Sequence, residues 1–268
     1  MNKDFKAGIV SVTFRQYAYE NFIKYTKLTD LSCVERGSDI HVPYNDIEKA
    51  LKVSKKMQEN NLETVSYASY YRLGISQQRA LLINAADTFT MILQIAGLIE
   101  APSIRVWGGE LSSARLDANA KKAIIDDTIR IAALAKASDK DISLEYHSNT
   151  ITDNAESAVD FIKAVRDGGG SNVYLYWQPN QNITFEKNKA ELKKICPYLT
   201  NIHVFAWQGN ERFPLEHHRD IWREYIDIIA EHNHGGGNAK HNFLLEFVKD
   251  DSVEQCIEDA KTLIELLN

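Results

Sequence analysis

Five side chains that can bind a cation or move a proton lie at or near the ends of apolar runs in the second half of the chain. They are Glu145, His147, Gln178, His203 and Glu246. Glu145 and His147 are two residues apart, so in a strand both side chains share one face. A carboxylate inside a run such as FLLEFV, which contains Glu246, needs a compensating partner because burying an unpaired charge is costly. A salt bridge would explain Glu246, and a bound metal ion or substrate would explain it as well.

Four of these side chains could share one ion if consecutive strands direct them at one point. They are Glu145, Gln178, His203 and Glu246. Oxygen donors together with one imidazole suit Mn²⁺, Mg²⁺, Co²⁺ or Zn²⁺. His203 alone would be explained equally well as a hydrogen-bonded core histidine, so the prediction of a metal site rests on its neighbours.

The pattern of elements along the chain provides a frame that can hold these residues. Short apolar runs alternate with amphipathic stretches of helical period, such as 152–167 and 251–267. The expected strands are 7–12, 32–37, 62–68, 103–109, 142–147, 172–177, 201–207 and 242–248. Eight such units in 268 residues predict an α/β fold, a single (β/α)8 TIM barrel domain over residues 1–268. Active sites of such barrels lie at the C-terminal ends of the strands.

Local signals support this frame. The segments TDNAE (152–156) and DDSVE (250–254) offer helix N-caps, and RDGGG (166–170) predicts a helix end. HNHGGGNAKHN (232–242) is expected to connect the seventh helix to the eighth strand. A doubly wound sheet would need a glycine-rich loop after its first strand, and SVTFRQ (11–16) contains no glycine.

Composition narrows the class of protein. The net charge is -6 without a basic block, which disfavours nucleic-acid binding, and no apolar run approaches the ~18 residues of a membrane span. The N-terminus lacks the apolar segment of a secretion signal. Cys33, Cys196 and Cys256 are far apart, which predicts reduced core thiols and a cytoplasmic protein. The oligomeric state stays open, a homo-oligomer included.

Over essentially its whole length, the chain resembles the sugar phosphate isomerase/epimerase superfamily. This superfamily contains the xylose isomerase-like barrels, among them D-tagatose 3-epimerase, inosose dehydratase-type proteins and, more distantly, the AP endonuclease family 2. The resemblance is carried by the strand-end residues above and by the segments ERGSDIHVP (35–43) and SYASYYRLG (66–74).

The resemblance implies roles for the strand-end residues. In the family a Glu, an Asp, a His and a Glu on strands 5 to 8 hold a metal, and the matching residues here are Glu145, Gln178, His203 and Glu246. The two family glutamates also exchange a proton beside the substrate carbonyl, through an enediolate. Gln178 departs from the family Asp, so one carboxylate is missing and a more weakly bound metal is expected.

Residues near the expected barrel mouth are candidates for binding a sugar or sugar phosphate. They are Asp39, His41, Trp107, His147 and Arg212. A solvated loop is the alternative for Asp39 and His41, and rim packing is the alternative for Trp107. Arg212 could grip a phosphate or carboxylate in a bidentate contact, or form a surface salt bridge.

The leading functional interpretation is a metal-assisted sugar or sugar-phosphate isomerase or epimerase. A lyase or dehydratase acting on a keto-polyol is a second interpretation, because the same enediolate can expel hydroxide. A barrel that has lost its metal and only binds a sugar is a third, and Gln178 is the feature that favours it.

Overall fold

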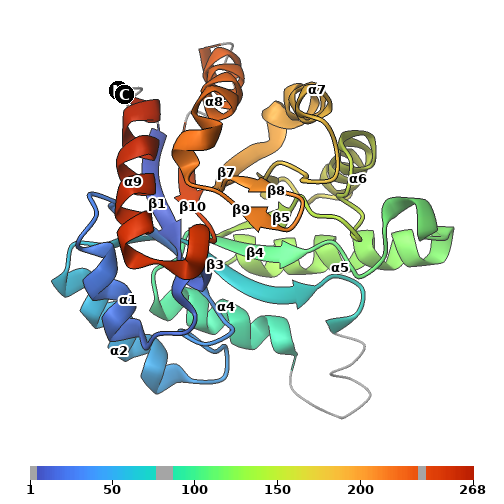
Figure 1. Cartoon of the computed structure of the whole chain (residues 1–268). Coiled ribbons are helices and arrows are strands. Elements are labelled where there is room, and N and C mark those ends of the chain that lie inside the picture. The colour runs from blue at the N-terminus through green and yellow to red at the C-terminus, as the bar shows by residue number, and fades with distance from the viewer. Residues whose placement is uncertain (1–4, 77–86, 235–239) are drawn as a thin grey trace.

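Eight parallel strands form a closed barrel, shown in Figure 1. The structure is a computed structural model, and it describes residues 5–76, 87–234 and 240–268. The barrel strands are β1 (Phe5–Val10), β2 (Cys33–Gly37), β3 (Glu63–Arg72), β4 (Ser103–Trp107), β5 (Asp141–Glu145), β6 (Val173–Trp177), β7 (Leu199–Val204) and β10 (His241–Leu245). β1 closes the barrel by pairing with both β2 and β10. The predicted (β/α)8 TIM barrel is therefore confirmed.

Helices surround the barrel (Figure 1). They are α1 (Tyr19–Thr26), α2 (Ile47–Glu59), α4 (Thr88–Leu98), α5 (Ala118–Lys136), α6 (Ala155–Asp167), α7 (Phe185–Ile195), α8 (Arg219–His234) and α9 (Val253–Leu267). In the described ranges, every helix is too short or too polar to cross a membrane. The hairpin of β8 (Trp207–Gln208) and β9 (Glu211–Arg212) follows β7, in a region that the sequence pattern assigned partly to the strand itself.

Helix ends follow the local signals in the sequence. The side chain of Asn154 caps α6 by accepting from the Ser157 amide, and that of Ser252 caps α9 by accepting from Gln255. Gly169, just past α6, has a φ of +101°, which a glycine adopts without strain. α8 extends to His234, and the middle of the expected 232–242 connection, residues 235–239, lies outside the described residues.

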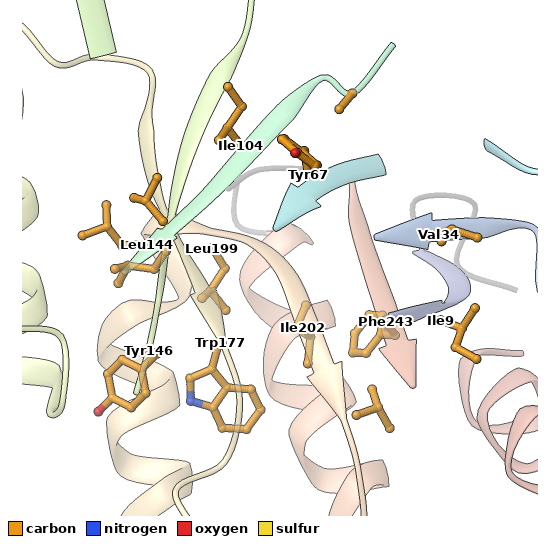
Figure 2. Close-up of a cluster of buried hydrophobic side chains, with 14 of the residues drawn as sticks. Ile9, Val34, Tyr67, Ile104, Leu144, Tyr146, Trp177, Leu199, Ile202 and Phe243 are labelled. Carbon is orange, nitrogen blue, oxygen red and sulfur yellow. The ribbon is translucent and has the colours of Figure 1, made fainter. Parts of the chain in front are cut away.

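The main core lies between the barrel wall and the helices, as Figure 2 shows. It contains strand residues such as Ile9, Val34, Leu144 and Phe243, all fully buried. Because side chains alternate across a strand, the neighbours of these residues point into the barrel. A smaller apolar cluster of Val10, Val12, Cys33, Val65, Tyr176 and Leu244 lies on that inner side. All three cysteines are free and buried, as expected.

Candidate active site at the barrel mouth

The four predicted ligand residues lie together at the C-terminal ends of β5, β6, β7 and β10. His203 Nδ1 lies 3.4 Å from Gln178 Oε1 and 3.4 Å from Glu246 Oε2. Gln178 Nε2 lies 3.4 Å from Glu145 Oε1. These contacts join the four side chains into one polar chain, and their role as metal ligands stays a prediction.

A buried arginine that the sequence reasoning missed lies beside this chain. Arg105 comes from β4; its Nε donates to Glu35 Oε1 at 2.9 Å and its Nη1 donates to Glu145 Oε2. The side chains are 3 % exposed for Arg105, 0 % for Glu35 and 5 % for Glu145. One guanidinium therefore compensates two buried carboxylates, and Glu145 already has a cationic partner.

The ion pair of Arg105 and Glu35 stays charged despite its burial. Burial alone would raise the pKa of Glu35, but the charge of Arg105 and the hydrogen bond from His203 outweigh it and lower this pKa to about 2. Burial likewise opposes the charge on Arg105, and the field of Glu35 reverses the effect, so the pKa of Arg105 is raised. The pair thus provides a fixed charge distribution under the mouth.

Glu35 also contacts His203 and sets the direction of its ring. His203 Nε2 lies 3.2 Å from Glu35 Oε1. With a proton on Nε2 for this carboxylate, the Nδ1 lone pair faces the oxygens of Gln178 and Glu246. Three lone-pair atoms that face one another repel unless a cation or a hydrogen-bond donor lies between them.

A divalent ion fits this donor set on one condition. In the described ranges, no group of three or more His, Cys, Asp and Glu side chains is placed to hold a metal ion. The amide oxygen of Gln178 must therefore be the third donor beside His203 and Glu246. Both oxygens of Glu145 already have partners, Arg105 Nη1 and Gln178 Nε2, so Glu145 stands outside this donor set.

A cavity of about 240 Å³ opens above these groups. Arg105, Glu145 and Glu246 line it together with Trp107 and His147. The rings of Trp107 and His147 lie 4.6 Å apart. The structure thus brings both predicted acid/base residues and two predicted substrate-binding residues to one cavity, with a volume suited to a monosaccharide.

Two further residues shape the cavity. Tyr70 lines it with a φ of +55°, an unfavourable conformation for a tyrosine, at a register shift between β3 and β4. His147 places Nδ1 at 2.8 Å from the Ser148 carbonyl oxygen, so Nδ1–H donates there and Nε2 stays available to a ligand. Burial lowers the pKa of His147, which favours the neutral ring.

Three predicted substrate-binding residues are absent from the described lining of this cavity: Asp39, His41 and Arg212. Asp39 Oδ2 lies 3.7 Å from Arg15 Nε. His41 is buried, with Nε2 at 2.9 Å from the Tyr17 carbonyl oxygen. Arg212 Nη1 donates to Asp251 at 2.5 Å, and its guanidinium covers the Trp207 ring at 5.0 Å.

A signal for the missed residues exists in the strand sequences. Arg105 lies two residues before Trp107 in the run SIRVWGG, so both point to the inner side of the barrel. Glu35 lies in SCVERG, two residues after Cys33, and the same parity turns it inward. A charged residue on the inner face of a buried strand needs an opposite charge from another strand.

Comparison with known proteins identifies structural relatives at low sequence identity. No protein-family model and no curated protein matches the chain. AsbF from Bacillus anthracis, a probable 3-DHS dehydratase, matches with a TM-score of 0.73 and 14 % identity, over 97 % of this chain and 98 % of AsbF. D-psicose 3-epimerase from Clostridium cellulolyticum H10, solved with D-tagatose, matches with a TM-score of 0.66 and 17 % identity, over 98 % and 95 %.

A third structure comes from Mycobacterium smegmatis, a xylose isomerase-like TIM barrel protein in complex with magnesium. It matches with a TM-score of 0.69 and 12 % identity, over 99 % of this chain and 97 % of that protein. Identities this low show a shared architecture and leave the reaction to be argued from the site. By its fold the chain is a TIM barrel, similar in structure to a xylose isomerase-like barrel protein, an epimerase and a probable dehydratase.

Proposed function

We propose that this protein is an enzyme that moves a proton at a carbon beside the carbonyl of a sugar or sugar derivative, as an isomerase or epimerase. The observation that carries the proposal is the presence of two carboxylates, Glu145 and Glu246, in one cavity of monosaccharide size. They come from β5 and from the end of β10, with β6 and β7 between them. A substrate held between them meets a carboxylate on either side.

The proton transfer can be written with these two residues. Glu246 removes a proton from the carbon, and the electron pair of that bond moves to the carbonyl oxygen to give an enediolate. Glu246 then returns its proton to the neighbouring carbon, which isomerises the sugar, or Glu145, after taking up a proton from solvent, protonates the opposite face of the same carbon, which epimerises it. Glu246 is assigned as the base because Arg105 compensates the charge of Glu145.

Negative charge grows on the substrate oxygen in this step, and the site contains cationic groups to stabilise it. The guanidinium of Arg105 lines the cavity and is held rigidly by Glu35. Gln178, His203 and Glu246 would hold a divalent ion such as Mn²⁺, Mg²⁺, Co²⁺ or Zn²⁺, whose charge polarises a carbonyl when it is bound.

A dehydratase acting on a keto-polyol is the second candidate, and His147 favours it. Its Nε2 makes no hydrogen bond with another described residue, and the ring lines the cavity. After Glu246 removes the proton, the electron pair forms a carbon–carbon double bond, and the hydroxyl on the next carbon leaves as water with the proton that Glu246 has taken up, while Nε2 of the neutral His147 accepts a hydrogen bond from another hydroxyl of the keto-polyol. The likeness to AsbF, a probable 3-DHS dehydratase, agrees with this candidate.

Solvent-deuterium incorporation tests the proposal. The protein, supplied with Mn²⁺ or Mg²⁺, is incubated in D₂O with D-fructose, D-tagatose and D-psicose, and deuterium at the carbons beside the carbonyl is followed by NMR. We expect incorporation with wild type, none with Glu246→Gln, and unchanged incorporation with Glu211→Gln, a surface control on β9.

The outcomes separate the candidate functions. Incorporation together with a new double bond in the product would identify a dehydratase. Equal exchange by wild type and Glu246→Gln would remove Glu246 from the role of base. Sugar binding without any exchange would leave a non-catalytic sugar-binding barrel.

A further inference from the structure

A second cavity, of about 280 Å³, lies beside the barrel mouth. It is bounded by the loop after β6 and by α7, the β8–β9 hairpin and α8. Gln181, Phe205 and Trp207 line both this cavity and the mouth, so the two share a wall. We name the second cavity the side groove.

The side groove has an apolar floor and a polar rim. Trp222 and Tyr225, only 1 % and 2 % exposed, form part of the floor together with Ile221 of α8. Asn180 and Gln208 add amides to the lining. The partly exposed rings of Phe185 and Trp207, which also line the groove, can accept the C–H faces of a pyranose, beside amides that bond its hydroxyls.

The floor contains the hydroxyl of Tyr225, which can form a hydrogen bond with a ligand. Tyr225 lines the groove, and its hydroxyl makes no hydrogen bond with another described residue. The hydroxyl oxygen of Tyr225 is not fully enclosed by protein, so it has access to the groove. A bound hydroxyl group would satisfy it.

We infer that the substrate is a glycosylated ketose, a disaccharide whose ketose unit keeps its free carbonyl and reacts in the mouth while the second sugar ring lies in the side groove. The inference rests on the proposed function, because it takes the mouth as the place of reaction. The glycosidic bond would cross the shared wall of Gln181, Phe205 and Trp207. The mouth has a volume of about 240 Å³ and the side groove about 280 Å³. Neither cavity alone has room for two sugar rings, but each has room for one.

Binding of matched sugars with and without a second ring tests the inference. Titration calorimetry would compare D-fructose with turanose, lactulose and isomaltulose, glycosides in which a glucose or galactose ring is attached to a hydroxyl of a fructose unit whose carbonyl stays free. We expect at least one glycoside to bind ten-fold or more tightly than D-fructose. Ile221→Trp should fill the groove and abolish that advantage while D-fructose binding stays unchanged.

Ile228→Trp is the matched control, since Ile228 lies two turns further along α8 and is not among the residues that line the groove. It should preserve the preference for the glycoside. Equal affinities for D-fructose and all three glycosides, or equal effects of the two tryptophan variants, would overturn the inference. Circular dichroism of both variants checks that they fold.

The failure of this inference is distinct from failure of the proposed function. Deuterium exchange into D-fructose without tighter glycoside binding removes the second-ring site and leaves the proton-transfer chemistry. Tighter glycoside binding that Ile221→Trp abolishes, without exchange into any sugar, supports the site and removes the chemistry.

Discussion

Arg105 and Glu35 form an ion pair inside the barrel, with Nε and Oε1 2.9 Å apart and both side chains almost completely buried. They come from β4 and β2, which are not neighbours in the barrel, so the pair spans its interior across β3. The same guanidinium holds Glu145, and the same carboxylate orients His203. The pair therefore positions residues on both sides of the candidate metal site.

Removing Arg105 should destabilise the fold strongly. Arg105→Met leaves Glu35 and Glu145 buried without their cationic partner, and we expect a loss of about 3–5 kcal/mol in the free energy of unfolding. Lys6→Met, which breaks the exposed pair with Glu63, is the control and should cost less than about 1 kcal/mol. Urea unfolding at pH 7 measures both; similar losses would show that the buried pair contributes no more than the exposed one.

Stability should fall in acid through Glu35. Its pKa is lowered to about 2 by Arg105 and His203 against the effect of burial, so the unfolded chain binds this proton first. The contribution is complete above about pH 4.5 and is lost as the pH falls toward 2, roughly 3 kcal/mol in all. Urea unfolding at pH 5, 4 and 3 should show a shallower decline in Glu35→Gln than in wild type, and parallel declines would contradict the prediction.

Asp259 should change the stability of the fold with pH in the opposite direction to Glu35. Burial raises its pKa to about 6, so the folded state binds the proton more tightly, and the stabilising contribution is lost as the pH rises through 6. Asp259→Asn keeps an oxygen that can accept from the Leu215 amide, as Oδ1 does now at 2.8 Å. We expect the variant to exceed wild type at pH 8 by on the order of 2 kcal/mol, with a smaller difference at pH 4. Thermal unfolding at both pH values measures this, and a pH-independent difference would argue against it.

Metal affinity should respond to charge at position 178. Gln178→Asp adds a full negative charge beside His203 and Glu246, so Mn²⁺ and Mg²⁺ should bind roughly ten-fold more tightly in titration calorimetry. Gln181→Asp adds the same charge at the cavity rim, and its effect should be much smaller. If both variants gain equally, position 178 acts through long-range charge and is not a ligand.

The barrel can be predicted from the sequence because its signals are local. Parallel strands that are covered on both faces appear in the sequence as apolar runs, and capping residues such as Ser252 mark the ends of helices. The convergence of the strand ends follows from the architecture, which is why the sequence alone is enough to group Glu145, Gln178, His203 and Glu246.

The parts of the site that escape such prediction depend on distant partners. The partnership of Arg105 with Glu35 requires the register of two non-adjacent strands, which no short sequence pattern contains. Arg212 is directed by the β8–β9 hairpin toward Asp251; the Gly209–Asn210 pair is a local signal for this hairpin, but it does not reveal the distant partner Asp251. His41 turns into the core because its loop folds back toward Tyr17.

In the proposed function, the β8–β9 hairpin would affect the choice of substrate without contributing to the proton transfer. Trp207 at its start borders both cavities, whereas the proposed acid/base residues belong to β5 and to the end of β10. The two strands meet at a tight Gly209 turn, and an ion pair between Arg212 and Asp251 fastens the hairpin. A descendant of this protein could exchange or lengthen this small ribbon to accept another second ring, while inheriting the proton-transfer residues intact.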